Sequence, residues 1–161
     1  MKYDIFNLKN IYRSKFLKNG FVLLKNYFSQ HEAKQIVKYA DDLQLYEEVL
    51  GKWMIYHEVN KDNQKQKSRI ENIVNYHKGV NNLLTHRVNS TLNFINGYDM
   101  TLFKDKLNWK SPGGQGFNAH QDQNAWSDFP PSQYVTVALF ADKSNLKNGC
   151  LEFAEGLEKR N

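Results

Sequence analysis

The chain is predicted to fold in the α+β class, with helices followed by a mainly antiparallel sheet. Two stretches with helical periodicity fall before Gly97, whereas β-prone runs dominate after it. The length of 161 residues suits one domain, and 40% hydrophobic residues are enough to form its core. We therefore expect a single domain over residues 1–161. Residues 1–97 would hold the helices and some strands, and residues 98–161 would begin the main β-structure.

The two predicted helices have recognisable boundaries. Ser29 and Glu32 form the S-x-x-E pattern of a capping box, in which each side chain bonds the backbone N–H of the other residue. Apolar residues then recur at helical spacing from Ala33 to Leu43. A second apolar face runs through residues 80–95. Gly97 is placed to end that helix, because glycine readily adopts the left-handed conformation of a helix C-terminus.

Apolar, β-branched and aromatic runs predict the strands. They cover residues 20–28, 53–58, 101–110, 134–142 and 150–154, with loops or turns at 60–68, 111–116 and 143–149. Side chains alternate between the two faces of a strand. In the run at 101–110, one face carries Leu102, Lys104, Lys106 and Asn108, and the other carries Phe103, Asp105, Leu107 and Trp109.

Charge and composition restrict the class of protein. The net charge is +5 and the sequence pI is about 9.2, which suits a nucleic-acid partner, an anionic small substrate or neither. The lysines form no dense tract, so we expect no nucleic-acid partner. One cysteine, Cys150, allows no internal disulfide. The N-terminus has no apolar signal-peptide core and no run is long enough to span a membrane, so we expect a soluble cytoplasmic protein.

The segment SPGGQGFNAHQDQNAW, residues 111–126, places a His-x-Asp pair directly after a glycine-rich run. On a strand, His120 and Asp122 would point to the same face. They would then offer two of the three ligands of a 2-His-1-carboxylate site for Fe(II), which leaves positions open for a cosubstrate and dioxygen. The alternative is a surface hydrogen bond at a strand end, with the glycines serving only as a turn.

The sequence segments around this pair resemble those of a known family. The segments LFKDKLNWKSPGGQGFNAHQD, YVTVALFAD and NGCLEFAEG, preceded by GFVLLKNYFS, GKWMIYHE and RIENIVNYH, are similar in order and spacing to the phytanoyl-CoA dioxygenase family. The closest similarity is to its small-molecule hydroxylases, such as those of 2-aminoethylphosphonate and ectoine. The resemblance implies a double-stranded β-helix, or jelly-roll, of which residues 98–161 would form the first part. It also implies Fe(II) as cofactor and 2-oxoglutarate as cosubstrate.

The resemblance also implies roles for particular residues. His120 and Asp122 would be the catalytic iron ligands. Other residues would contact the cosubstrate (Asn108, Thr136 and Lys106) or a small polar, anionic substrate (Trp126, Lys104 and Arg69). Some of these side chains have plainer alternatives: core packing for Trp126, a solvated strand face for the two lysines, and an ion pair with Glu71 or Asp99 for Arg69. His57 and His77 are interpreted as structural histidines.

Part of the family pattern is absent. The resemblance expects a second histidine far downstream of His-x-Asp, followed by an arginine that binds 2-oxoglutarate. This chain has no histidine after His120, and Glu158, in GLEK, stands at the place of that histidine. Three alternatives follow: a fragment of a longer enzyme, one half of a split enzyme completed by a second polypeptide, or a non-catalytic relative that acts as a binding module. The substrate, the oligomeric state and the third ligand stay open.

Overall fold

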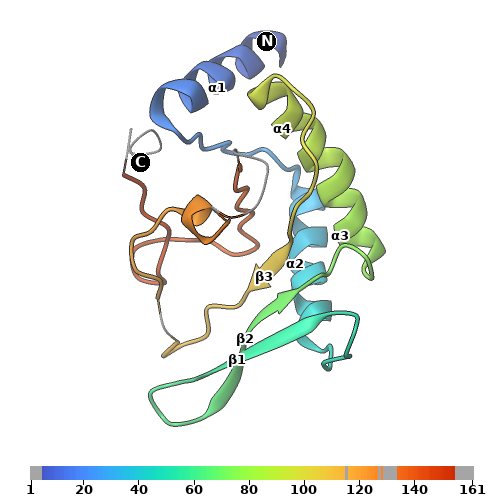
Figure 1. Ribbon diagram of the computed structural model, residues 1–161, viewed down its shortest axis with the longest axis vertical. Helices are drawn as coiled ribbons and strands as arrows, with labels where there is room; N and C mark the ends of the chain where they lie inside the picture. The colour runs from blue at the N-terminus through green and yellow to red at the C-terminus, as the bar shows by residue number, and fades with distance from the viewer. Residues whose placement is uncertain (1–4, 115, 127, 129–133, 155–161) are drawn as a thin grey trace.

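The computed structural model describes residues 5–114, 116–126, 128 and 134–154 (Figure 1). Its elements, in chain order, are α1 (Ile5–Asn19), α2 (Gln30–Gln44), β1 (Met54–Val59), β2 (Lys65–Glu71), α3 (Lys78–Asn82), the π-helix η1 (Leu83–Val88), α4 (Asn89–Asn96), β3 (Lys106–Asn108) and the 3-10 helix η2 (Asp122–Trp126). Helices and an antiparallel sheet are both present, which confirms the α+β prediction at this level. No helix in the described ranges has the length and apolar character needed to cross a membrane.

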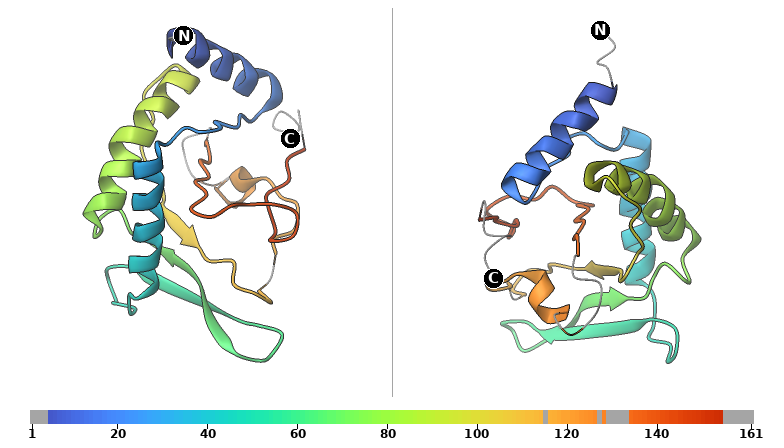
Figure 2. Two further views of the ribbon diagram at one scale, coloured as in Figure 1. Left: turned by 180° about the vertical axis from the view of Figure 1, so that it is seen from behind. Right: turned by 45° about the horizontal axis from the view of Figure 1, so that its top comes forward.

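The sheet has three antiparallel strands in the order β1-β2-β3. Ile55, Ile70 and Leu107 are paired across it and therefore share one face. Ile70 is fully buried at the centre of that face and packs with Leu43 of α2 and with Ile73. Figures 1 and 2 show the helices along one side of the molecule, with the segments that follow β3 on the other side. The apolar face of the sheet thus forms the core against the helical layer.

The opposite face of the sheet is polar. Arg69 of β2 lies between Tyr56 of β1 and Asn108 of β3, and Glu71 pairs with Lys106. The predicted alternation is confirmed for β3, because Lys106 and Asn108 are on this polar face and Leu107 is on the apolar one. This face is turned away from the core.

Both ends of α2 are held by side chains. The predicted capping box is present: the Ser29 hydroxyl accepts from the Glu32 N–H, and the Glu32 carboxylate accepts from the Ser29 N–H. At the other end, the Lys67 ammonium donates to the carbonyls of Gln44 and Tyr46, at 2.8 and 2.6 Å. A cation at the C-terminal end of a helix satisfies free carbonyls and complements the helix dipole. Lys67 therefore ties β2 to the helical layer.

The second predicted helix is a continuous helical run from α3 through η1 to α4, so it begins two residues earlier than expected. His77 caps its start, since its Nδ1 accepts from the Val80 N–H at 3.1 Å. This confirms the structural interpretation of His77. Gly97 ends α4 as predicted, with a φ of 90°. Beside it, Arg13 of α1 donates to the carbonyls of Phe94 and Ile95.

The Gly97→Ala substitution is expected to lower the free energy of unfolding by about 1–2 kcal/mol, since an L-residue is strained at positive φ. A Cβ at this position would also meet the Arg13 guanidinium. Gly51→Ala is the matched control, because Gly51 has a φ of 79° and open space around it. Chemical denaturation of both variants measures the difference. Equal losses in the two variants would show that the Arg13 contact contributes nothing.

Several predicted strands are wrong in extent or absent. No strand is assigned to residues 20–28, 134–142 or 150–154. Within the run at 101–110, only β3 is a strand. A strand requires a hydrogen-bonded neighbour as well as β-prone residues, and no neighbouring ladder is assigned to these segments within the described ranges. Conversely, β2 begins inside the predicted loop at 60–68. Its polar residues occupy a strand because they pair with β1 across a tight turn. Helix α1 was not predicted.

Candidate metal centre

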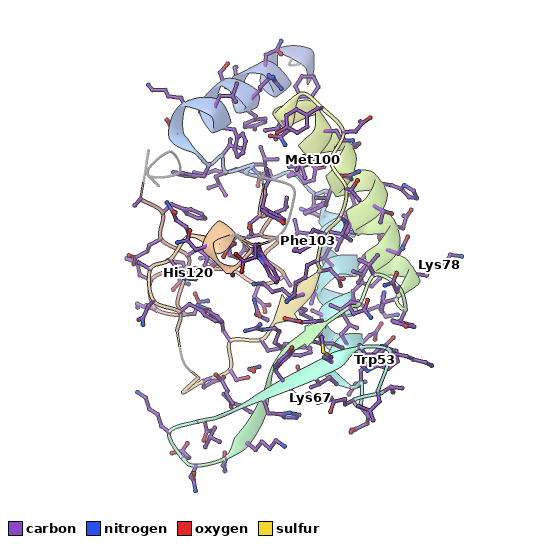
Figure 3. The ribbon with its side chains drawn as sticks, viewed as in Figure 1. Trp53, Lys67, Lys78, Met100, Phe103 and His120 are labelled. Carbon is purple, nitrogen blue, oxygen red and sulfur yellow. The ribbon has the colours of Figure 1, made fainter. Side chains whose placement is uncertain are left out.

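The His-x-Asp pair does not lie on a strand, as the sequence analysis had expected. Asp122 is the first residue of η2, and His120 lies just before it. The two side chains nevertheless converge: His120 Nε2 is 3.2 Å from Asp122 Oδ1, and both side chains are about half exposed. Figure 3 shows His120 near this turn, on the side of the molecule away from Lys78. The chain leading into η2 therefore brings the two side chains together without the strand that was expected.

A backbone carbonyl fixes the proton on the His120 ring. His120 Nδ1 is 2.6 Å from the Asn118 carbonyl oxygen. A carbonyl oxygen only accepts hydrogen bonds, so Nδ1 carries the proton and acts as the donor. In the neutral ring Nε2 then keeps its lone pair, which is the form that binds a metal. The atom of His120 that faces Asp122 is thus the one available as a ligand.

This arrangement fits a cation. A lone pair on Nε2 and a carboxylate oxygen 3.2 Å away repel each other unless a proton or a metal ion stands between them. Two neighbouring ligands of an octahedral divalent metal, each about 2.1 Å from it, lie about 3 Å apart. The observed separation is close to that value. His120 and Asp122 therefore suit two adjacent positions of one metal site.

The other oxygen of Asp122 is also engaged. The Thr136 hydroxyl lies 2.6 Å from Asp122 Oδ2, and because an ionised carboxylate only accepts, the hydroxyl is the donor. Of the other residues expected at the cosubstrate, Asn108 and Lys106 are exposed on the polar face of the sheet. The structure thus brings Thr136 to the pair and leaves Asn108 and Lys106 on β3.

Arg69 and Lys104, both expected at the substrate, converge on Glu71. The Glu71 carboxylate is 3.1 Å from Arg69 and 3.0 Å from Lys104, and its side chain is only 3% exposed. The Arg69 guanidinium also stacks over the Tyr56 ring. The ion pair with Glu71 is the alternative that the sequence analysis gave for Arg69. Glu71 pairs with both cations and offsets one of their two positive charges.

The ionisation of Glu71 depends on these two cations. Burial by itself raises the pKa of Glu71, but the hydrogen bonds and charges of Lys104 and Arg69 outweigh burial and lower the pKa below its ordinary value. The carboxylate is therefore ionised at neutral pH. Glu71 joins strand β2 to the segment before β3 through a charged contact.

Trp126, at the end of η2, packs in an aromatic cluster. Its ring lies 5.1 Å from Phe103, and Phe103 in turn lies 5.1 Å from Tyr134. The Lys104 ammonium is 5.2 Å from the centre of the Trp126 ring. Such cation–π and edge-to-face contacts stabilise a defined ring position. Lys104 therefore connects the buried Glu71 to the 3-10 turn that begins with Asp122.

The third ligand is not found among the described residues. Within them, no group of three or more His, Cys, Asp or Glu side chains is placed to hold a metal ion. Glu158, which stands where the family pattern has histidine, lies outside the described residues. His57 is exposed on β1. The structure thus shows two side chains that fit one metal site.

Comparison with known proteins identifies the family. The chain belongs to the phytanoyl-CoA dioxygenase (PhyH) family, whose sequence profile matches residues 16–160. This confirms the resemblance on which the residue assignments were based. No solved structure matches the chain.

The similar curated proteins are named dioxygenases and hydroxylases. The chain is 37% identical over 143 residues to a 2-aminoethylphosphonate dioxygenase of Uncultured bacterium HF130_AEPn_1, a match that covers 88% of this chain and 55% of that protein. It is 34% identical to the dioxygenase lolE1 of Epichloe uncinata, over 68% of this chain and 42% of that protein. It is 28% identical to a methylphosphonate hydroxylase of Gimesia maris, over 88% and 54%. The chain thus spans about half the length of these relatives.

Sequence reasoning missed several residues around the pair. The Asn118 carbonyl acts through the backbone, which no side-chain pattern reveals. Phe103 and Tyr134 were interpreted only as strand residues, although Phe103 packs on Trp126 and Tyr134 packs on Phe103. Glu71 was named only as a partner of Arg69, and its second contact with Lys104 depends on the pairing of β2 with β3. That pairing is a tertiary feature without a local sequence signal.

Proposed function

We propose that the protein carrying this chain is a non-haem Fe(II)- and 2-oxoglutarate-dependent dioxygenase that hydroxylates a small anionic molecule. The convergence of His120 Nε2 and Asp122 Oδ1 at 3.2 Å is the observation that carries the proposal. Family membership supports the reaction type. One relative, from Stutzerimonas stutzeri, is named as a probable alpha-ketoglutarate-dependent hypophosphite dioxygenase, which supports the choice of cosubstrate.

The residues of this chain have defined tasks in this proposal. His120 offers Nε2 because the Asn118 carbonyl holds the ring proton on Nδ1. Asp122 offers Oδ1 and brings one negative charge to the metal. Bound Fe(II), with 2-oxoglutarate and dioxygen, supplies the oxidising chemistry that hydroxylates a C–H bond. The family resemblance also assigns a second histidine as third ligand and an arginine for the cosubstrate, and no histidine follows His120 in this chain.

An anionic ligand is favoured by the charges of the polar face. Lys106 and Asn108 are exposed there, next to the strand that carries Arg69 and Glu71. Lys104 and Arg69 share the single carboxylate of Glu71, so this group keeps one net positive charge, and Lys106 adds a further exposed cation on β3. These charges favour a carboxylate or a phosphonate as the ligand. The names of two relatives, which refer to phosphonates, support the same class of substrate.

We further propose that residues 98–154 belong to the first part of a double-stranded β-helix. Five large apolar side chains of this region are 43–62% exposed: Phe117, Val137, Phe140, Leu151 and Phe153. In a jelly-roll such residues pack against a facing sheet. Family membership supports this assignment, since the profile match extends through these residues.

The proposed activity predicts a dependence of turnover on cosubstrate and substrate. The full-length natural protein that contains residues 1–161, supplied with Fe(II), 2-oxoglutarate and dioxygen, is expected to form succinate. Adding 2-aminoethylphosphonate or methylphosphonate should raise the rate several-fold over a neutral amine or alcohol of the same size. Succinate formation that no phosphonate stimulates would contradict the substrate class. Absence of any 2-oxoglutarate consumption would contradict the reaction type.

A further inference from the structure

We infer that Thr136 is a positioning residue for the metal-binding carboxylate of Asp122, an inference that rests on the proposed function. The Thr136 hydroxyl donates to Asp122 Oδ2 at 2.6 Å. This distance is typical of a strong hydrogen bond to an ionised carboxylate. The family resemblance predicts a contact of Thr136 with the cosubstrate, whereas its partner in the structure is the carboxylate itself.

The hydrogen bond decides which oxygen of Asp122 faces His120. The terminal torsion of an aspartate is broad and roughly two-fold, so an unrestrained carboxylate presents either oxygen in many orientations. With Oδ2 bound to Thr136, Oδ1 is the oxygen directed at His120 Nε2, 3.2 Å away. Thr136 therefore selects a carboxylate orientation in which one oxygen is directed toward the site.

His120 and Asp122 are held in matching ways. His120 Nδ1 donates a hydrogen bond to the Asn118 carbonyl. On Asp122 the second oxygen bonds Thr136. Partners of this kind orient ligands and typically change metal affinity by about 10–100-fold when they are removed. Because both proposed ligands are exposed at the surface of the described residues, these hydrogen bonds replace the packing that would otherwise restrict the side chains.

A second contact holds the segment that carries Thr136. Tyr134, two residues earlier, lies 5.1 Å from Phe103, which itself packs on Trp126 at the end of η2. The chain around Thr136 and the turn that begins with Asp122 are thus joined at two points, one polar and one aromatic. The hydroxyl is consequently presented to Asp122 from a defined direction.

The test compares Mn(II) affinities of the full-length natural protein and its Thr136 variants without 2-oxoglutarate. Free Mn(II), measured by electron paramagnetic resonance, gives Kd directly. Thr136→Val keeps the shape of the side chain but removes the hydroxyl, and is expected to raise Kd by about 10-fold. Thr136→Ser keeps the hydroxyl and should restore affinity to within about 2-fold of the wild type if the hydrogen bond is responsible. Thr101→Val, at an exposed threonine, is the control for the substitution itself.

The outcomes separate this inference from the proposed function. Wild-type Mn(II) affinity in Thr136→Val would overturn the positioning role. If a separate titration with 2-oxoglutarate then showed weaker cosubstrate binding in that variant, the hydroxyl would be a cosubstrate contact instead. Failure of the wild-type protein to bind Mn(II) would overturn the proposed function and the inference with it. Circular dichroism of each variant establishes that the fold is retained. A folded Thr136→Ser protein that binds Mn(II) as weakly as Thr136→Val does would also contradict the role of the hydroxyl.

Discussion

Replacing either His120 or Asp122 with alanine is expected to abolish tight binding of Fe(II) or Mn(II), with a loss in affinity of more than about 100-fold. The two side chains converge at 3.2 Å and present a nitrogen and an oxygen to one point. Removing one leaves a single described ligand, and water fills the vacated position. Chelator competition on the full-length natural protein measures this loss.

Two comparisons make this prediction specific. Asp122→Asn keeps the shape of the side chain and removes its charge, so it should weaken binding less than Asp122→Ala but still by about 10-fold or more. His31→Ala, at an exposed histidine in the first turn of α2, should leave affinity unchanged. Metal affinity that survives in both alanine variants would mean that the metal binds elsewhere.

Replacing Glu71 with glutamine is expected to lower the free energy of unfolding by about 2–3 kcal/mol. The carboxylate is almost fully buried between Arg69 and Lys104, at 3.1 and 3.0 Å. An amide has about the same size, but it leaves two neighbouring cations without a counter-charge. Breaking a fully buried pair costs about 3–5 kcal/mol. The expected loss is smaller because the Arg69 and Lys104 side chains are 29% and 34% exposed. Denaturant unfolding measures it, with the exposed Glu47→Gln as the control.

The stability that Glu71 contributes is expected to depend on pH. The pKa of Glu71 is lowered in the folded protein. Its stabilising contribution is therefore fully present above the unfolded pKa, near 4.5, and is lost as the pH falls through the lower folded value. The stability difference between wild type and Glu71→Gln should accordingly be constant near neutral pH and shrink in acid. A difference that grows as the pH falls would contradict the assignment of the ionised form.

Local patterns in the sequence predicted the features that depend on local physics. The capping box of Ser29 and Glu32, the end of α4 at Gly97 and the alternation of Lys106, Leu107 and Asn108 each depend on neighbours a few residues away. The convergence of His120 and Asp122 was also predicted, although the pair lies at the start of η2 and not on a strand. The two residues are only two positions apart, so this contact too depends on near neighbours in the chain.

Features that depend on distant partners were not predicted. The polar sequence of β2 predicts a loop, and its strand conformation follows only from its pairing with β1. Residues 134–142 have strong β propensity but no assigned ladder among the described residues. The contact of Thr136 with Asp122 joins positions 14 residues apart, and that of Lys104 with Glu71 requires β3 to lie beside β2. Family resemblance placed these residues near the site, but their partners required the three-dimensional structure.

A crystal structure of the full-length natural protein, grown without oxygen in the presence of Mn(II) and 2-oxoglutarate, tests the central claim most directly. We expect one metal ion bound by His120 Nε2 and by one oxygen of Asp122, with 2-oxoglutarate chelated to it and Thr136 on the second oxygen of Asp122. A metal ion bound by other residues, or a His120–Asp122 pair joined only by a direct hydrogen bond under saturating Mn(II), would contradict the account.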